Sequence, residues 1–376
     1  MECYLDNSAT TKPCKAAVEA VVSSLENDWG NPSSIHQKGV NSFLVLGNSR
    51  KVIAKSLLCE NGEIYFTPSG TVANNTAIFG AVNSLKRRGN KIVTTAFEHP
   101  SVQKCMDKLS DDGFEIVRIK PQKNGSIDVD DFENVIDENT ILVSLMAVNN
   151  EVGTILPFDK IKKIISKKNS PALLHVDNVQ GYLKIPVIPK NCGIDLLSVS
   201  AHKVHGPKGI GALYINKNVK IKPYVLGGGQ ENSMCSGTQG TPAIAGFAAA
   251  VEDFGSTADN LKKIENLNLR FKEQLKSIDG VFVNSPDDAI PYIINLSLTK
   301  IPSQVSVNYF SMNHVFISAG SACSKGHRSE VLSAMELPPE RIDSALRISL
   351  SHNTTELEID RCIEVIKASI SELRKK

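Results

Sequence analysis

The stretch Ile141-Leu142-Val143-Ser144-Leu145-Met146 decides the fold class, because apolar side chains follow one another with a single serine between them and no charge. A strand that is apolar on both faces is typical of a parallel sheet covered by helices on each side. Six similar segments alternate with helical stretches along the chain, at 64–67, 91–95, 114–118, 173–176, 196–199 and 210–215. This alternation predicts an α/β fold with a mostly parallel seven-stranded sheet.

The chain is long enough for a second, smaller domain. Its 376 residues exceed the usual size of one domain. A helical run after Thr241 is interrupted near Gly255, and an amphipathic stretch then leads to candidate strands at 292–298, 315–318 and 344–349 and to a helix from Thr354 to the end. We therefore expect a large domain of residues 13–256 and a smaller α+β domain formed by residues 1–12 and 257–376.

Composition and charge limit the partners. Hydrophobic residues make up 41% and charged residues 22%, as in an ordinary soluble enzyme. The net charge of +2 comes from 42 basic and 40 acidic residues without a long run of either, which argues against direct nucleic-acid binding. The first residues lack the pattern of a signal peptide, and no apolar run approaches membrane-spanning length. We expect a cytoplasmic protein without a membrane partner.

The eight cysteines are scattered and form no CxxC pair, so we expect neither a metal site nor a disulfide framework. Most of them are expected to be small buried hydrophobes. Cys323 differs, because it lies among small residues between Gly320 and Gly326, which is typical of a loop. Lys325, His327 and Arg328 follow it and could favour the nucleophilic thiolate.

Polar side chains follow four of the predicted strands at their carboxyl ends, where open parallel sheets bind ligands. An aspartate ends one strand, and a lysine follows 26 residues later. This pair suits pyridoxal 5′-phosphate, since a lysine can hold the cofactor covalently and a carboxylate can keep its ring nitrogen protonated. The residues at the four strand ends are His99, Asn150, Asp177, Ser200, His202 and Lys203.

A candidate phosphate site lies at Thr67-Pro68-Ser69-Gly70-Thr71, between a predicted strand and a predicted helix. Backbone amides at a helix start bind phosphate. In this loop and in several other motifs, the chain resembles the cysteine desulfurases of the NifS/IscS type. These belong to the class V aminotransferase superfamily, which has the pyridoxal-phosphate-dependent fold type I. The motifs that carry the resemblance are YLDNSATT (4–11), GNPSS (30–34), VNNEVG (148–153), HVD (175–177), SAHK (200–203), GPKGIG (206–211) and SAGSAC (318–323).

The resemblance implies a role for each candidate residue. Lys203 would hold the cofactor and carry protons, Asp177 would pair with its ring nitrogen, and His99 would stack on its ring. Gln180 would bind the phenolic oxygen of the cofactor, and Asn150 would bind the same oxygen or the substrate carboxylate. The phosphate would be held by Gly70, Thr71, Ser200 and His202, and Thr238 would reach the phosphate of a neighbouring subunit, which implies a homodimer with composite sites.

The implied reaction converts L-cysteine to L-alanine. Arg347 would bind the substrate carboxylate, and Cys323 would receive the sulfur as a persulfide and pass it to an acceptor protein. The chain departs from the family pattern at Cys235, where an arginine is usual, and at Pro68 and Val72 of the phosphate loop. Only 23 residues separate Cys323 from Arg347, so the acceptor could be a tRNA-thiolation sulfurtransferase instead of an iron–sulfur scaffold.

Two other functions remain open from the sequence. A class V aminotransferase or a selenocysteine lyase would keep Lys203, Asp177 and His99 but would have no obligate use for Cys323. A catalytically silent subunit that serves as a partner platform is a hypothesis of another class, suggested by Cys235 and the altered phosphate loop. The retained lysine, aspartate and arginine argue against that silent role.

Overall fold

The structure, a computed structural model, describes residues 2–319 and 328–374. Its centre is a seven-stranded sheet in the order β2-β8-β7-β6-β5-β3-β4. Every neighbouring pair is parallel except those formed by β8, which runs antiparallel to both β2 and β7. The strands are β2 Ile64–Thr67, β3 Lys91–Thr95, β4 Glu115–Ile119, β5 Thr140–Met146, β6 Leu173–Asp177, β7 Leu196–Ser200 and β8 Gly211–Ile215. The predicted sheet is confirmed.

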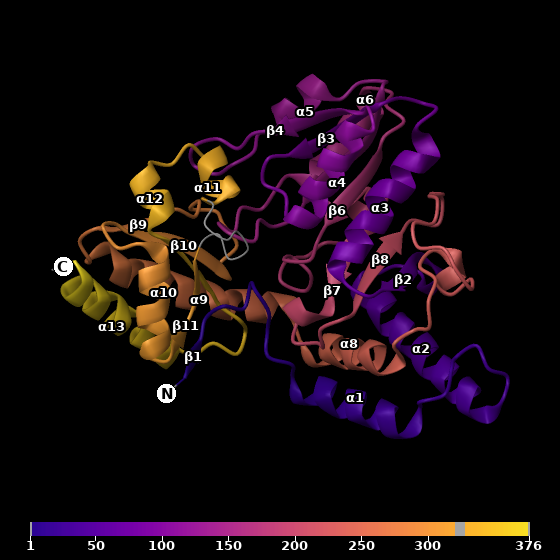
Figure 1. The fold of residues 1–376 in the computed structure, drawn as a ribbon, viewed down its shortest axis with the longest axis horizontal. Coiled ribbons are helices and arrows are strands. Elements are labelled where there is room, and N and C mark those ends of the chain that lie inside the picture. The colour runs from indigo at the N-terminus through magenta and orange to yellow at the C-terminus, as the bar shows by residue number, and fades with distance from the viewer. Residues whose placement is uncertain (1, 320–327, 375–376) are drawn as a thin grey trace.

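Helices cover both faces of this sheet (Figure 1). Strand β5 is buried along its whole length, as its apolar sequence requires. Leu142 packs in the cluster shared with α3 and α4, and Val143 packs in the larger cluster on the other side. The helices of this part are α1 Lys15–Asn27, α2 Gln37–Ser56, α3 Gly70–Leu85, α4 Pro100–Asp111, α5 Val129–Val135, α6 Phe158–Lys167, α7 Pro189–Cys192 and α8 Thr241–Asp253.

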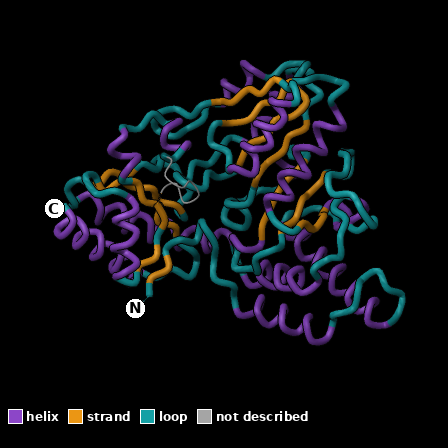
Figure 2. Tube along the Cα trace, in the orientation of Figure 1, coloured by secondary structure: helices purple, strands orange, loops and turns teal. Residues whose placement is uncertain are grey.

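A second, four-stranded antiparallel sheet has the order β12-β13-β10-β9. Figure 2 shows the strands of the C-terminal part as a group apart from those of the seven-stranded sheet. Strand β1 pairs with β11 in a separate parallel ribbon, so the amino terminus lies beside the C-terminal part. The strands are β1 Cys3–Tyr4, β9 Val281–Val283, β10 Ile293–Leu298, β11 Val315–Phe316, β12 Ser318–Ala319 and β13 Ala345–Ser349. The helices are α9 Thr257–Lys276, α10 Ser303–Met312, α11 Glu330–Ala334, α12 Pro339–Asp343 and α13 Glu356–Leu373.

The two sheets agree with the expected large and small units, while the limits at residues 12 and 256 stay predictions. Helix α8 ends at Asp253 and α9 begins at Thr257, which matches the interruption read from the sequence. The expected strand at 315–318 is two short strands that pair with different partners. None of the helices within the described residues combines the length and apolar character that a bilayer span needs.

The core of the C-terminal part generates a stability prediction. Phe271 of α9 is fully buried, whereas Leu269 of the same helix is 61% exposed. We expect Phe271→Ala to lower the free energy of unfolding by about 3 to 5 kcal/mol, because it removes a buried ring and leaves a cavity. Leu269→Ala, the control, is expected to change it by less than about 0.5 kcal/mol. Denaturant titration measures both, and equal losses would contradict the packing described.

Candidate functional site

Lys203 lies directly after β7, in a short helical turn of residues Ala201–Lys203. Its amine donates hydrogen bonds to the backbone oxygens of Ser8 and Ala9, the latter at 2.9 Å. Burial lowers the pKa of Lys203 to about 7, and the positive charges of Arg347 and Lys184 add to the shift. A substantial fraction of the amine is therefore neutral near pH 7, which is the nucleophilic form.

Asp177 lies at the end of β6 and His99 lies after β3, two strands of the seven-stranded sheet that have β5 between them. Asp177 closes β6, and its Oδ1 accepts a hydrogen bond from the backbone N–H of Val179 at 3.0 Å. His99 caps α4, and its Nδ1 accepts from the backbone N–H of Ser101 at 3.1 Å. Burial lowers the pKa of His99, so the ring is neutral at pH 7 and carries its proton on Nε2.

Asn74 of α3 connects these two residues. Its Nδ2 donates to Asp177 Oδ2 at 2.7 Å and to Ser101 Oγ at 2.9 Å. Ser101 Oγ in turn lies 2.9 Å from His99 Nδ1. The carboxylate and the imidazole are thus held by one amide. We did not single out Asn74 from the sequence, although it lies one helical turn after Gly70 and so faces the same side of α3.

The start of α3 lies against the end of β7. A Cβ at Gly70 would come within 2.9 Å of Val179 Cγ2 and within 3.3 Å of Ser200 Cβ, so the close approach needs glycine. In the first turn of α3, the N–H of Val72 donates to Ser69 Oγ at 3.2 Å, whereas the N–H groups of Gly70 and exposed Thr71 have no helical partner and suit an anion. Gly70, Thr71 and Ser200 are therefore brought together as the sequence predicted.

His202 and Gln180 contact the N-terminal segment. His202 Nδ1 lies 3.2 Å from Thr10 Oγ1, and burial together with the charge of Lys203 lowers the pKa of His202 to about 4. Its ring is therefore neutral. Gln180 Nε2 donates to the backbone oxygen of Ser8 at 2.9 Å, while its Oε1 is buried without a partner among the described residues.

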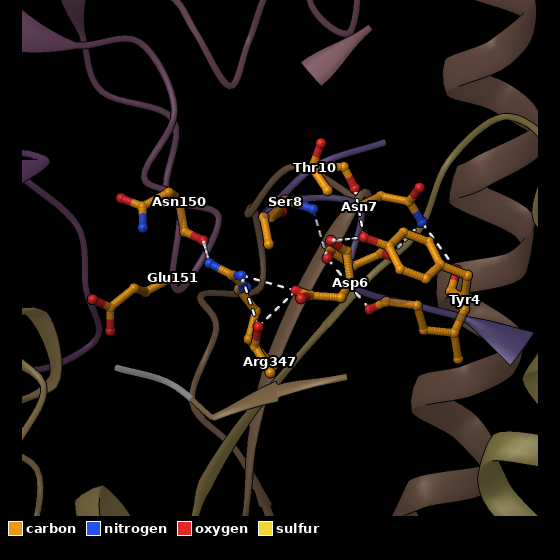
Figure 3. Close-up of polar contacts among 12 residues, drawn as sticks. Tyr4, Asp6, Asn7, Ser8, Thr10, Asn150, Glu151 and Arg347 are labelled. Carbon is orange, nitrogen blue, oxygen red and sulfur yellow. Dashed lines mark hydrogen bonds and ion pairs between the residues drawn. The ribbon is translucent and has the colours of Figure 1, made fainter. Parts of the chain in front are cut away.

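Arg347 of β13 is almost completely buried (Figure 3). Its Nη2 donates to Asp6 Oδ1 at 2.9 Å and to Ser318 Oγ at 3.0 Å, and its Nη1 donates to the backbone oxygen of Asn150 at 3.0 Å. The side-chain amide of Asn150 points away from this fork. Asp6, which the sequence analysis did not single out, thus already neutralises part of the charge expected to bind a substrate carboxylate.

The remaining candidates stand apart. Thr238 is exposed in the connection between β8 and α8. Cys323, Lys325 and His327 lie outside the described residues. Arg328, which was expected to favour a thiolate, is paired with Asp343 at 2.7 Å. Cys235 is buried, and burial raises the pKa of its thiol, so it behaves as a small hydrophobe.

The donor set fits pyridoxal 5′-phosphate. A helix start for a phosphate, a carboxylate for a ring nitrogen, a neutral imidazole and a partly neutral lysine all lie at the carboxyl ends of strands of the seven-stranded sheet. Buried atoms without partners among the described residues, Gln180 Oε1 and both side-chain polar atoms of Asn178, lie in the turn after β6. Such atoms need a ligand or water to satisfy them.

Comparison with known proteins identifies the family. Residues 3–362 match the aminotransferase class-V family. The chain belongs to this family. It is 37% identical to a protein named cysteine desulfurase IscS from Dictyoglomus turgidum, over 99% of this chain and 95% of that protein. A solved NifS-like protein superposes with a TM-score of 0.93 at 34% identity, covering 99% of this chain and 100% of that one.

A second solved structure, entitled SspA in complex with cysteine, has a TM-score of 0.82 at 30% identity and covers 94% of this chain and 100% of its own. The predicted resemblance to NifS/IscS-type desulfurases is therefore confirmed, and so is the predicted fold type I. This family depends on pyridoxal 5′-phosphate. The roles of individual residues stay predictions.

The pKa of Lys203 can be measured in the cofactor-free protein. We expect the rate of acylation of Lys203 to rise with pH with a midpoint near 7, because burial and nearby cations favour the neutral amine. Exposed Lys104, whose pKa is raised by its hydrogen bond to Asp107, is the internal reference and should react only at much higher pH. Competitive labelling with peptide mass spectrometry measures both. A common pH profile for the two lysines would overturn the assignment.

Proposed function

We propose that this protein is a pyridoxal-phosphate-dependent cysteine desulfurase that converts L-cysteine to L-alanine and leaves the sulfur on Cys323 as a persulfide. The observation that carries the proposal is that the buried amine of Lys203 and the buried guanidinium of Arg347 flank one segment, residues 6–9, beside Asp177. An amino acid can there meet a proton carrier at one end and a carboxylate receptor at the other.

When bound, the cofactor withdraws electrons from the Cα of the amino acid. Asp177, oriented by Asn74, would stabilise a positive charge on the ring nitrogen of the cofactor. The neutral His99 ring, held on the same network, would stack on the ring of the cofactor. Lys203 moves the proton at Cα, a task that suits an amine with a pKa lowered to about 7.

Arg347 orients the substrate. Its fork suits a carboxylate held bidentately, and the contact with Asp6 must rearrange or be shared when the substrate binds. Because Asp6 lies on the segment that also supplies the acceptors of Lys203, substrate binding at Arg347 is coupled to the position of the lysine amine. Asn150 holds the guanidinium from the other side through its backbone oxygen.

Cys323 receives the sulfur in this proposal. The described chain contacts Arg347 at Ser318, five residues before Cys323. The thiolate of Cys323 attacks the substrate sulfur, so that an S–S bond forms while the S–Cβ bond breaks. The electron pair stays on the carbon fragment, which takes up protons and leaves as alanine. L-Cysteine and one thiol thus give L-alanine and one persulfide.

A second copy of this chain is the proposed partner in the site. Large apolar side chains are exposed on α1, on α2 and on the connection between them, a pattern typical of a protein interface. Leu226 is exposed in the connection that also carries Thr238. A homodimer that covers this surface could place Thr238 in the other subunit. The exposed residues are Val18, Val22, Leu25, Trp29, Ile35, Phe43, Leu44 and Leu226.

The persulfide is proposed to pass to an acceptor protein in the cytoplasm, either an iron–sulfur scaffold or a tRNA-thiolation sulfurtransferase. The alternatives, an aminotransferase or a selenocysteine lyase, differ in their products. The silent-subunit hypothesis conflicts with two retained arrangements: Asp177 and His99 are held through Asn74, and Lys203 and Arg347 are held by residues 6–9.

The assay with L-cysteine separates these functions. The purified protein loaded with pyridoxal 5′-phosphate should produce alanine and sulfide in equal amounts in the presence of a thiol reductant, because each persulfide is reduced to sulfide. Amino-acid analysis and a sulfide assay on the same samples measure both products. Transamination without sulfide, or activity with selenocysteine alone, would contradict the proposal.

Replacement of the acceptor thiol tests Cys323 directly. Cys323→Ser should abolish persulfide and sulfide formation and leave the visible absorption of the bound cofactor unchanged, since the hydroxyl cannot accept the sulfur. Cys192→Ser, at the end of α7, is the matched control and should keep full activity. Sulfide release by the Cys323 variant at the rate of the control would refute the role of Cys323.

A further inference from the structure

The connection that carries Thr238 is held by an ion pair to α2. The two terminal guanidinium nitrogens of Arg50, Nη1 and Nη2, donate to the carboxylate of Glu231 at 2.7 and 2.8 Å. The Glu231 side chain is only 2% exposed and the Arg50 side chain 17%. A bidentate pair of this kind fixes both distance and orientation.

Glu231 makes two further contacts that define its position. Its Oε2 accepts the backbone N–H of Phe66 in β2 at 2.8 Å, and its Oε1 accepts from Gln239 Nε2 at 3.3 Å. Gln239 is the neighbour of Thr238 in the chain. The carboxylate therefore ties the Thr238 segment to the edge strand β2 and to α2 at once.

The backbone around Glu231 depends on these contacts. Glu231, Asn232 and Ser233 are three successive non-glycine residues with positive φ, at 50°, 51° and 67°. Each left-handed residue of this type is unfavourable and persists only where other contacts impose it. The turn directs the chain back, and Gly237 N donates to Gln230 Oε1 at 3.0 Å, immediately before Thr238.

The contacts of Glu231 could support the cofactor site of its own subunit or that of the partner subunit. Through Phe66, Glu231 contacts the strand that leads to Gly70 in its own subunit, a contact made by one backbone N–H of β2, which pairs with β8 on its other side. Through Gln239 and the strained turn, it sets a segment whose Thr238 is exposed on its own subunit. The strained turn and the contact with Gln239, the neighbour of Thr238, lie on the second route.

We propose that Glu231, held by Arg50, is a positioning residue that sets Thr238 for the cofactor phosphate of the partner subunit. This inference rests on the proposed homodimer and on the proposed role of Thr238. Glu231 then acts across the interface, on the site that contains the Lys203 of the other subunit. Neither residue belonged to the set predicted from sequence.

Cofactor affinity gives the first test. In Glu231→Gln, one carboxylate oxygen becomes an NH₂ that cannot accept from Arg50, so the segment is released from α2. We expect the dissociation constant of pyridoxal 5′-phosphate, measured by titration of the cofactor-free dimer, to rise about tenfold or more, because a hydrogen bond to a charged phosphate is lost. Thr238→Ala should give a rise of the same size.

A matched control separates positioning from general destabilisation. Asp195 also accepts a backbone N–H, from Leu174 at 2.8 Å, and pairs with Lys162 at 2.6 Å, but it lies at the opposite end of β7. Asp195→Asn should lower the melting temperature as Glu231→Gln does and leave cofactor affinity unchanged. Equal losses of affinity in the two variants would overturn the proposal.

A mixed dimer tests whether Glu231 acts on the cofactor site of its own subunit or on that of the partner subunit. We would purify dimers with one Glu231→Gln subunit and one Lys203→Ala subunit through two different tags. Only the Glu231→Gln subunit then carries Lys203. Its site receives Thr238 from a subunit in which Glu231 is intact. Borohydride reduction makes the cofactor attachment to Lys203 permanent, and peptide mass spectrometry reports its occupancy at limiting cofactor, independently of any desulfurase activity.

Occupancy of Lys203 in the mixed dimer should return to the wild-type value, and activity should reach about half of wild type per dimer because one of two sites is complete. Occupancy as low as in the Glu231→Gln homodimer would mean that the residue serves its own subunit and would overturn the proposal, as would a monomeric wild-type protein. A cofactor-loaded wild type that releases no sulfide would instead refute desulfuration and leave the occupancy result standing.

Discussion

The contacts of residues 5–11 are the constraint on which the site depends. This segment leaves the ribbon formed with β11, passes Ser349 and Arg347 of the four-stranded sheet, and reaches Lys203 and His202 of the seven-stranded sheet. Figure 1 shows it running from β1 to α1 between the two parts of the molecule. Its carbonyl oxygens orient a lysine amine, and its one carboxylate orients an arginine. Movement of one sheet against the other would disturb both.

The electrostatic character of the site follows from how its charges are buried. Lys203, Lys184 and Arg347 influence one another, and burial lowers the pKa of Lys184 to about 8. The pKa values of two nearby carboxyl groups shift in the opposite direction. Burial raises the pKa of Glu98 to about 8 and that of Glu151 to about 7. Near neutral pH burial therefore favours the neutral forms of these two lysines and two glutamates, while the guanidinium of Arg347 can attract an anion. A carboxylate and a phosphate are anions of the required kind.

Local sequence was sufficient for the features that depend on local periodicity. Apolar runs such as Ile141–Met146 marked the strands, and a polar residue after each run marked the edge at which ligands bind. Asp6, Asn74 and Glu231 were not found in this way, because their roles arise from contacts with residues far away in the chain, such as Arg347, Asp177 and Arg50. Strands β1 and β9 are two and three residues long, and only their pairing partners define them.

Lys203 and Cys323 are proposed to act in one reaction. Transfer of labelled sulfur from the substrate to Cys323 tests whether they do. Cofactor-loaded wild-type protein and a Lys203→Ala variant would be given L-cysteine with radioactive sulfur, alkylated and digested, and the peptide that contains Cys323 would be isolated. We expect label on this peptide in the wild type, removed by a thiol reductant, and none in the variant. Label on that peptide in the variant, or its absence from the wild type, would contradict transfer of sulfur to Cys323 by the chemistry of Lys203.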